Sequence, residues 1–334
     1  MTYKDKKIGV TIPAYNEEKL IIDTLMSIPN WIDVIVIIND KSKDKTGLVV
    51  KQFLQNDLMN DEHRIFHLIN HEVNTGVGGA IISGHKFLQS KNCDIFVVMA
   101  GDNQMDPNFL DDLLTPILTL NYDYAKGNRF FGEDSLRNMP AYRKFGNYIL
   151  SFLNKFGTGY WSIFDPQNGY TAIKNDTFSK LNKNRLNKRY NFENSILVEL
   201  NVIGATVADV SIPAVYGREQ STINLFSFIP KTILNQLRYF ISRNIRKNYY
   251  INYNPIGTYY LFGLFSLLFS FFWAIWILFH RFSLQENISN GTYLLFFIPL
   301  LLGFTSFQFA ITQEINEEKM NILHKKLDGL LKKK

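Results

Sequence analysis

Two long stretches without charged residues lie near the C-terminal end of the 334-residue chain and limit the folds that it can adopt. No Lys, Arg, Asp or Glu occurs between Lys247 and Arg281, and a second uncharged stretch runs from residue 287 to residue 313. A membrane-spanning helix needs about 20 predominantly apolar residues, and both stretches supply them. Buried core helices are the alternative, but these are usually shorter and keep a polar face. The pattern therefore predicts two transmembrane helices, over residues 255–280 and 292–312.

The two predicted helices form a hairpin because only a short linker separates them. Basic residues occur on both outer flanks, whereas Arg281 is the only one in the linker. They are Arg238, Arg243, Arg246 and Lys247 before the first span, and Lys319, Lys325, Lys326 and residues 332–334 after the second. The positive-inside rule then places both flanks in the cytoplasm. We expect a multi-pass protein of the cell (inner) membrane whose large N-terminal region is cytoplasmic.

The net charge of +6 does not indicate nucleic acid, since the basic residues cluster beside the predicted spans. Anionic lipid headgroups explain that placement better, so the expected partner is the lipid bilayer. Charged residues at 4–7 and an apolar run broken at Pro13 argue against a secretory signal peptide. Cys93 is the only cysteine, which excludes an intramolecular disulfide and a multi-cysteine metal site. We expect it to pack just before a buried strand.

The first 130 residues alternate between strand-like and helix-like segments. The short, β-branched segments typical of buried parallel strands are 8–13, 34–39, 65–70 and 95–100. The segments with helical apolar spacing are 17–28, 44–54 and 79–89. A helix from residue 191 and a strand over 206–213 follow later. This alternation predicts a doubly wound α/β sheet, in which ligands bind beyond the carboxyl ends of the strands.

Residues 225–250 combine apolar and aromatic side chains with Lys231, Arg238, Arg243 and Arg246. A basic amphipathic segment directly before a span is typical of a helix at the membrane interface. A packing helix of the globular domain is the alternative. We favour the interface because the segment is rich in aromatic residues and adjoins a predicted span.

Two loops that follow the first two predicted strands expose polar groups. The first, 13–18, gives main-chain groups and the Glu17 carboxylate at a helix start, although a capped turn would have the same composition. In the second, 39–46, Asp40 at the strand tip could accept hydrogen bonds from a base or a sugar. Ser42 and Asp44 are typical capping residues.

The third and fourth loops carry glycines and a carboxylate. Gly76 and Gly78 allow a ligand to approach the backbone closely, but a dinucleotide G-x-G-x-x-G is excluded because Ile81 stands three positions beyond Gly78. Asp102 and Gln104 are two apart at an extended strand tip, so both can point the same way. Oxygen ligands of that kind suit Mg²⁺ or Mn²⁺ bridging a diphosphate. An aspartate-rich helix start before Pro107 is the alternative for this loop.

Taken together and in this order, the loops resemble those of glycosyltransferase family 2, in particular its dolichyl-phosphate mannose synthase-like, polyprenyl-phosphate glycosyltransferase branch. The resemblance extends over about residues 7–221. It implies an α/β fold with a GT-A-type, Rossmann-like, mostly parallel sheet, here followed by the interfacial segment and the transmembrane hairpin. It also implies inverting transfer of a hexose from a nucleotide-diphosphate-sugar donor to an undecaprenyl or dolichyl phosphate acceptor, with Mg²⁺ or Mn²⁺ as cofactor.

The loop positions and the resemblance assign roles to individual residues. Nucleotide-sugar binding is expected of Pro13, Ala14, Tyr15, Glu17, Asp40, Gly76, Gly78 and Asp102. The catalytic group is expected to comprise Asp102, Arg129, Arg143 and Asp165, and the metal ligands are Asp102 and Gln104. The acceptor phosphate is expected to meet Arg129, Arg143, Arg218 and Ser221. The sequence departs from the family pattern where Asn39 and Ala100 stand in place of aspartates.

The acceptor determines which side chains the chemistry needs. A phosphate monoester, with a second pKa of about 6, is already largely anionic near pH 7, so arginines that position it matter more than a base. A sugar hydroxyl of a glycolipid or polysaccharide would instead need a base, for which Asp165 and Glu193 are candidates. A third reading is a nucleotide-binding membrane adaptor without catalysis.

We therefore expect five consecutive parts in the chain. They are a cytoplasmic GT-A domain (1–224), an interfacial segment (225–250), two transmembrane helices (255–280 and 292–312) and a basic cytoplasmic tail (313–334). The hairpin could also pack against other copies of itself in a homo-oligomer.

Overall fold

The computed structural model describes residues 3–55, 64–129, 141–189, 191–213, 225–251, 253–285 and 287–331, with the side chains of 141–147 and 225–231 outside that description. The chain forms two compact units. The first comprises residues 1–240 together with 321–334, and the second comprises residues 241–320. Each unit is described by itself below.

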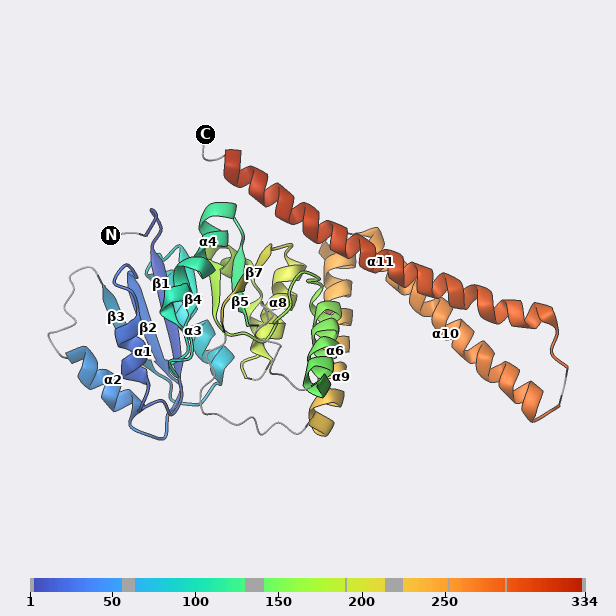
Figure 1. Cartoon of the computed structure of the whole chain (residues 1–334), viewed down its shortest axis with the longest axis horizontal. Helices are drawn as coiled ribbons and strands as arrows, with labels where there is room; N and C mark the ends of the chain where they lie inside the picture. The colour runs from blue at the N-terminus through green and yellow to red at the C-terminus, as the bar shows by residue number, and fades with distance from the viewer. Residues whose placement is uncertain are drawn as a thin grey trace. The chain divides into compact units, whose positions relative to one another are not determined.

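A seven-stranded sheet forms the centre of the first unit (Figure 1). Its strands are β1 (Ile8–Ala14), β2 (Val34–Asn39), β3 (Ile65–Asn70), β4 (Ile95–Val98), β5 (Tyr124–Asn128), β6 (Thr171–Lys174) and β7 (Val207–Ser211). They lie in the order β3-β2-β1-β4-β6-β5-β7. β6 is antiparallel to both neighbours and the remaining pairs are parallel. The predicted α/β fold with a mostly parallel sheet is confirmed.

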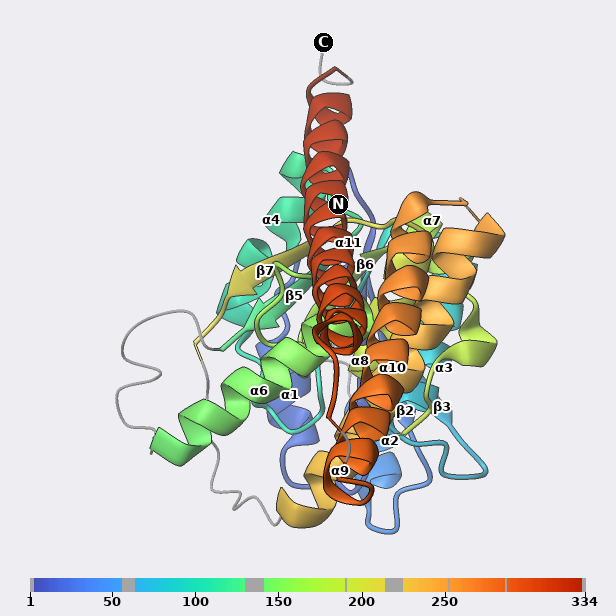
Figure 2. The ribbon, with the colours of Figure 1, turned by 90° about the vertical axis from the view of Figure 1, so that its right-hand side faces the viewer.

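Helices cover both faces of this sheet because the side chains of each buried strand alternate between two cores. In β2, Ile35 and Ile37 face one core and Val36 and Ile38 face the other. The first core takes side chains from α1 (Ile21–Ser27), α2 (Thr46–Gln55) and α4 (Leu110–Leu120). The second takes them from α3 (Val77–Ser90), α7 (Asn175–Lys180) and α8 (Phe192–Val202). Figure 2 shows α4 and α3 on opposite sides of the strands.

Two short 3₁₀ helices lie between the larger elements of this unit. Asp106 accepts a hydrogen bond from Asn108 N at 2.9 Å and caps η2 (Pro107–Phe109). A second short 3₁₀ helix, η3 (Lys183–Arg185), precedes α8. Cys93 is fully buried just before β4, as expected, and burial raises the pKa of its thiol to about 12.

Helices α6 (Ala141–Thr158) and α9 (Leu225–Asn244) pack together in the first unit as far as Phe240. The rings of Phe156 and Phe240 stack with their centroids 4.1 Å apart, and Gln236 is almost fully buried. On the same helix Leu234 and Leu237 are 49% and 47% exposed. The predicted amphipathic segment thus has a packed face and an exposed apolar face.

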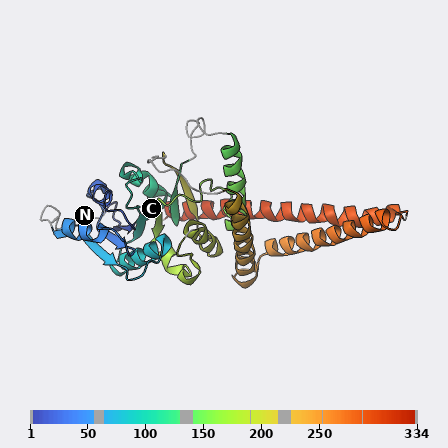
Figure 3. The same cartoon turned by 90° about the horizontal axis from the view of Figure 1, so that it is seen from below.

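The second unit contains a π-helical segment, η4 (Ile245–Ile251), the helix α10 (Pro255–Phe282) and most of α11 (Asn290–Leu331). Both long helices are apolar enough to cross a membrane, and only 17% and 11% of their most apolar stretches are buried within the protein. This exposure distinguishes them from core helices. Figure 3 shows α10 and α11 running alongside each other. The helices approach closely at Gly263 and Gly303, where a Cβ at either would lie 3.2 Å from the other's carbonyl oxygen.

Helix α11 is longer than the expected span, since it continues without a break to Leu331. Its last residues, from Asn321, belong to the first unit. There Lys325 Nζ lies 2.9 Å from Asp123 Oδ1, and its carbonyl accepts a hydrogen bond from Asn121 Nδ2 at 3.4 Å. The residues expected to form a basic tail are therefore helical as far as Leu331 and contact the start of β5.

Candidate active site

The first two loops at the carboxyl edge of the sheet are hydrogen-bonded to each other. The main-chain amides of Asn16, Glu17 and Glu18 donate to side chains of the second loop, at 2.8–3.1 Å. Their acceptors are Ser42 Oγ, Thr46 Oγ1 and Asp44 Oδ2. In return, the side chains of Asn16 and Glu18 accept from the amides of Lys43 and Lys45. Pro13, Ala14, Tyr15 and Glu17 therefore stand on a loop with a fixed backbone.

Asp40 joins the second loop to the third. Its Oδ1 accepts from Thr75 N and Thr75 Oγ1 and lies 2.7 Å from His71 Nδ1, while its Oδ2 accepts from Gly76 N at 2.7 Å. Burial alone would raise the pKa of this carboxyl, but the hydrogen bonds outweigh burial and lower it. The charged carboxylate therefore orders residues 71–76, with most of its acceptor capacity used inside the protein.

The glycines of the third loop allow residues 187–189 to pack closely against it. Gly76 has φ +83°, and a Cβ there would lie 2.6 Å from both Lys188 O and Arg189 Cγ. A Cβ at Gly78 would collide with Asn187 O. Glycine is thus required where residues 187–189 cross the start of α3. This close approach between two segments of the chain was not foreseen from the sequence, where the glycines indicated only an approaching ligand.

Asp102 and Gln104 lie in the fourth loop, next to the first. Gly101 N donates to Pro13 O at 3.3 Å, and a Cβ at Gly101 would be 3.5 Å from Glu17 Cγ. The main-chain amide of Gln104 donates to Asp102 Oδ1 at 3.1 Å, which turns the loop tightly around the carboxylate. This loop therefore brings Asp102 close to the residues expected to bind the nucleotide.

The oxygen donors of this loop suit a divalent ion that a ligand also coordinates. Within the described residues no group of three or more His, Cys, Asp or Glu side chains could hold a metal. One carboxylate and one amide oxygen are hard ligands that Mg²⁺ and Mn²⁺ accept, but they leave most of an octahedral shell to phosphate oxygens and water. The donor set fits an ion shared with a diphosphate and does not fit a metal cage made by protein alone.

A largely buried ionic cluster lies beside β5 and β7. Arg129 donates from Nε and Nη2 to the two oxygens of Asp165, at 2.8 and 3.2 Å, and its main-chain amide also donates to Asp165. Asp165 is 2% exposed, whereas the side chain of Arg129 is 44% exposed. Burial would raise the pKa of Asp165, but the arginine and Lys126 lower it. The pair therefore keeps Asp165 ionised and orients a guanidinium that reaches solvent.

Two further buried ionisable groups in this cluster, Lys126 and Asp209, were missed from the sequence. Lys126 is fully buried, donates to the carbonyl of Asp165, and has a pKa that burial lowers against the pull of nearby carboxylates. Burial also raises the pKa of Asp209, which accepts from Asn128 Nδ2 and Phe164 N. The signal that could have found Lys126 is a lysine in the middle of a short strand, Tyr124–Asn128.

Glu193 lies in the first turn of α8, and burial raises the pKa of its carboxyl. A Cβ at Gly169 would lie 4.0 Å from Glu193 Oε1 and 3.3 Å from Met105 Cε. Tyr170 Oη also donates to Asp106 O at 3.3 Å. The turn before β6 thus links the fourth loop to Glu193.

The expected site residues are in part brought together. The loops that carry Pro13, Asp40, Gly76 and Asp102 are neighbours, and Arg129 and Asp165 are directly paired. Arg143 lies on α6 with its side chain outside the described residues. Arg218 and Ser221 also lie outside the described residues.

Comparison with known proteins identifies related chains. A family model for glycosyl transferase family 2 matches residues 9–182, more than half of the chain. The chain is 32% identical over 219 residues to the UDP-N-acetylglucosamine–dolichyl-phosphate N-acetylglucosaminyltransferase of Methanococcus voltae, covering 64% of this chain and 87% of that protein. It is 26% identical over 210 residues to the undecaprenyl-phosphate mannosyltransferase of Micrococcus luteus, covering 62% and 82%.

A solved structure shares the fold. Glucosyl-3-phosphoglycerate synthase from Mycobacterium tuberculosis, in complex with uridine diphosphate, aligns with a TM-score of 0.51 over 72% of this chain and 80% of that chain. The sequence identity is 18%, so the alignment bears on architecture alone. It supports the GT-A-type arrangement of the first unit.

Proposed function

The chain belongs to glycosyl transferase family 2 and is a glycosyltransferase, and we propose that it moves a sugar from a nucleotide-diphosphate-sugar to an undecaprenyl or dolichyl phosphate. The observation that carries the choice of acceptor is the match to two relatives whose names specify dolichyl phosphate and undecaprenyl phosphate, each covered over more than four fifths of its length. The two exposed apolar helices support it, because a lipid-linked acceptor requires an enzyme at the membrane.

The donor occupies the edge formed by the first, second and fourth loops in this proposal. Solved structures of the M. tuberculosis synthase contain Mn²⁺ with uridine-diphosphate-glucose, which supports a nucleotide-sugar and a divalent ion here. Asp102 and Gln104 would hold Mg²⁺ or Mn²⁺, which neutralises charge on the departing diphosphate. The backbone of residues 13–18 holds the nucleotide, and Asp40 acts on it through the third loop that it orders.

The acceptor phosphate is the nucleophile. One of its oxygens attacks the anomeric carbon while the bond from that carbon to the diphosphate breaks. The configuration at the anomeric carbon is therefore inverted. Arg129 positions the phosphate, since its guanidinium is both oriented by Asp165 and 44% exposed. Asp165 is a poor base because Arg129 lowers its pKa. The reaction does not need a base, as the phosphate is already ionised.

A second acceptor class is favoured by one observation. The pKa of Glu193 is raised by burial, and a carboxyl with a raised pKa is a better general base near neutral pH. If the acceptor is a sugar hydroxyl of a glycolipid or polysaccharide, Glu193 takes its proton. A nucleotide-binding adaptor without transfer remains the alternative that the transfer assay below separates.

We propose that α10 and α11 cross the membrane as a hairpin with the first unit in the cytoplasm. Residues 321–331 of α11 belong to the first unit through contacts such as Lys325 with Asp123, so the chain that follows the second span lies on the same side as the sheet. Basic residues flank the pair on that side, which favours the cytoplasm.

A transfer assay tests the function. Membranes containing the protein are incubated with Mg²⁺ or Mn²⁺, radiolabelled nucleotide-sugars and short-chain polyprenyl phosphate, and label is extracted into organic solvent. We expect lipid-soluble label that mild acid releases, lost in Asp102→Ala and retained in Asp112→Asn, an exposed carboxylate on α4. Nucleotide binding without lipid-soluble label from any donor would rule out the phosphate acceptor and lead to hydroxyl acceptors, then to the adaptor.

A further inference from the structure

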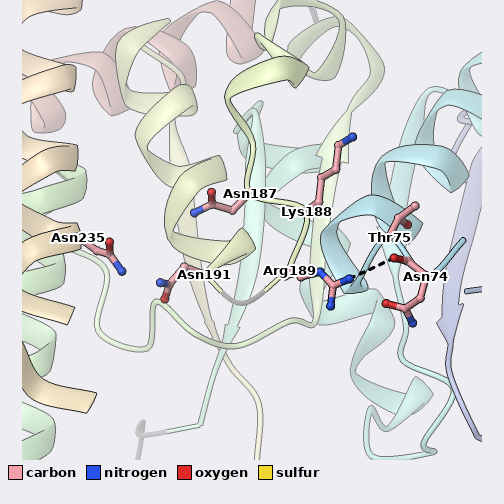
Figure 4. A pocket seen from close by; sticks show the side chains of 7 residues that line it. All are labelled: Asn74, Thr75, Asn187, Lys188, Arg189, Asn191 and Asn235. Atoms are coloured by element: carbon pink, nitrogen blue, oxygen red, sulfur yellow. Dashed lines mark hydrogen bonds between the residues drawn. The ribbon is translucent and has the colours of Figure 1, made fainter. Parts of the chain in front are cut away.

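A polar cavity of about 630 Å³ lies in the first unit, between the third loop, residues 187–189 with Asn191, and α9 (Figure 4). Its wall consists of five uncharged hydrogen-bonding side chains, among them Thr75 and Asn235, and two cations, Lys188 and Arg189. Among the described residues, no carboxylate lines it. Cavities of about 300–1,000 Å³ hold small molecules, but most are predominantly apolar. The composition of this wall therefore selects for a polar and negatively charged ligand.

The two cations have no anionic partner within the described part of the chain. Arg189 Nη2 donates to a neutral acceptor, Asn74 O, at 3.3 Å, and leaves its other donors for a ligand. Neither Lys188 nor Arg189 forms an ion pair with a described carboxylate. Solvated surface charge is the plain alternative, but two adjacent cations in a concave wall without a carboxylate concentrate positive potential.

The backbone that carries the cations is fixed on both sides. Lys188 O accepts from Gly79 N at 3.0 Å, and Asn187 N donates to Ser195 Oγ at 2.9 Å. Asn187 Nδ2 also donates to Tyr239 Oη on α9 at 2.5 Å. Because Gly76 has no side chain, Arg189 can lie directly against the third loop. The backbone of this wall is thus held in place before any ligand arrives, which lowers the cost of binding.

We propose that this Lys188–Arg189 pocket is a phosphate-binding subsite. Arginine binds phosphate oxygens in a bidentate manner and lysine adds a mobile point charge, while the amide side chains suit neighbouring hydroxyl groups. The inference rests on the proposed function for the source of the phosphate, which is either the diphosphate of the donor or the phosphate of the lipid acceptor. Both ligands present the same chemistry to the pocket, and binding measurements separate them.

The test compares Lys188→Gln and Arg189→Gln with the wild type, using the full chain in lipid nanodiscs. Arg185→Gln is the matched control, because Arg185 is an exposed cation on η3 that does not line the cavity. One arm titrates UDP and GDP by calorimetry, and the other measures binding of short-chain polyprenyl phosphate. Loss of one charge-assisted contact should lower the affinity for the affected ligand about ten-fold or more, whereas the affinity of the control variant should change less than about two-fold. Added salt should reduce the difference in affinity between each variant and the wild type.

Each outcome has a distinct meaning. Weaker nucleotide binding assigns the pocket to the donor, and weaker polyprenyl-phosphate binding assigns it to the acceptor. Unchanged binding of both ligands in both variants would overturn the proposed phosphate-binding subsite, as would a wild type that binds neither ligand. The transfer assay tests the proposed function separately. If pocket variants lose nucleotide binding in a protein that transfers no sugar, the pocket stands and the proposed function falls.

Discussion

At the scale of single residues, Asp40 shows that a polar side chain at a strand tip can stabilise a neighbouring loop of the protein and need not contact a ligand directly. The sequence indicated a contact with a base or a sugar, whereas the carboxylate accepts hydrogen bonds from Thr75 and Gly76 and pairs with His71. Sequence alone placed the aspartate at the correct edge of the sheet. It could not reveal the partners, because residue 75 approaches residue 40 only through the tertiary fold.

Asp40→Asn should lower the stability of the first unit by about 1–3 kcal/mol, since buried donors lose a charged acceptor. The pKa of Asp40 is lowered in the folded protein, so its contribution is present above the unfolded-state value of about 3.9 and is lost as the pH falls through the folded pKa. Thermal unfolding between pH 3 and pH 7 measures this. The variant should have a flatter acid limb than the wild type or the control Asp23→Asn, and an identical limb would refute the role.

Gly76→Ala should destabilise the protein by more than backbone strain alone. Gly76 and Gly204 both have positive φ, +83° and +69°, which costs a non-glycine residue about 1–3 kcal/mol. A Cβ at Gly204 meets nothing within 4 Å, whereas one at Gly76 would lie 2.6 Å from Lys188 O, a backbone atom that cannot move cheaply. Gly204→Ala is therefore the control for strain. Equal losses in the two variants, by thermal unfolding, would mean that residues 187–189 yield easily.

Glu193→Gln distinguishes the two acceptor classes. For a phosphate acceptor we expect transfer within a few-fold of the wild type, because no base is needed. For a hydroxyl acceptor the loss should be about 100-fold or more. In that case the wild-type rate should rise with pH through the raised pKa of Glu193, and this rise should disappear in the variant. Rates with saturating donor between pH 5 and pH 8 provide the measurement.

At the scale of secondary-structure elements, strands were easier to predict than helix ends. β2 and β3 have the bounds that their β-branched runs predict. The first helix, expected from residue 17, begins at Ile21, because the amides of Glu17 and Glu18 bond to the second loop. The antiparallel β6 was not foreseen, since direction depends on long-range pairing. Helix α11 outlasts its apolar span because residues 314–331 remain good helix formers.

The contact between α10 and α11 at Gly263 makes an element-scale prediction. A Cβ at Gly263 would lie 2.7 Å from Phe307 Cδ2 and 3.2 Å from Gly303 O, so Gly263→Leu should force the helices apart. Gly291→Leu is the control, since its nearest neighbour, Ser289 Oγ, is 3.8 Å away. We expect faster protease cleavage of the linker and a lower unfolding temperature in the first variant only. Equal behaviour of both would show that the close approach does not stabilise the hairpin.

At the scale of the whole molecule, the sequence predicted the globular domain and the two apolar helices more readily than the residues that form the sites. Hydropathy marked the spans, and loop order marked the family. The buried cluster around Lys126 and the Lys188–Arg189 pocket escaped notice, since neither has a local pattern. Sites assembled from distant segments become visible only when the sheet brings those segments together.

The buried cysteine allows a direct test of topology. Cys93 is fully buried and burial raises the pKa of its thiol to about 12, so at neutral pH it should not react with a maleimide. A single Ser289→Cys in the linker should then be labelled by an impermeant maleimide on intact cells. Asn108→Cys, an exposed position on η2, should be labelled only after permeabilisation. The opposite pattern would invert the proposed orientation.

The five hydrogen bonds in which side chains accept from main-chain amides across the first and second loops have a consequence for how such enzymes diversify. A graft that replaces one loop with that of a relative leaves donors and acceptors of the other without partners. Residues 13–18 and 39–46 should therefore be inherited as one cassette. Donor preference, if it is exchanged between relatives, should travel with both loops together, and chimeras that carry only one of them should be the ones that fail.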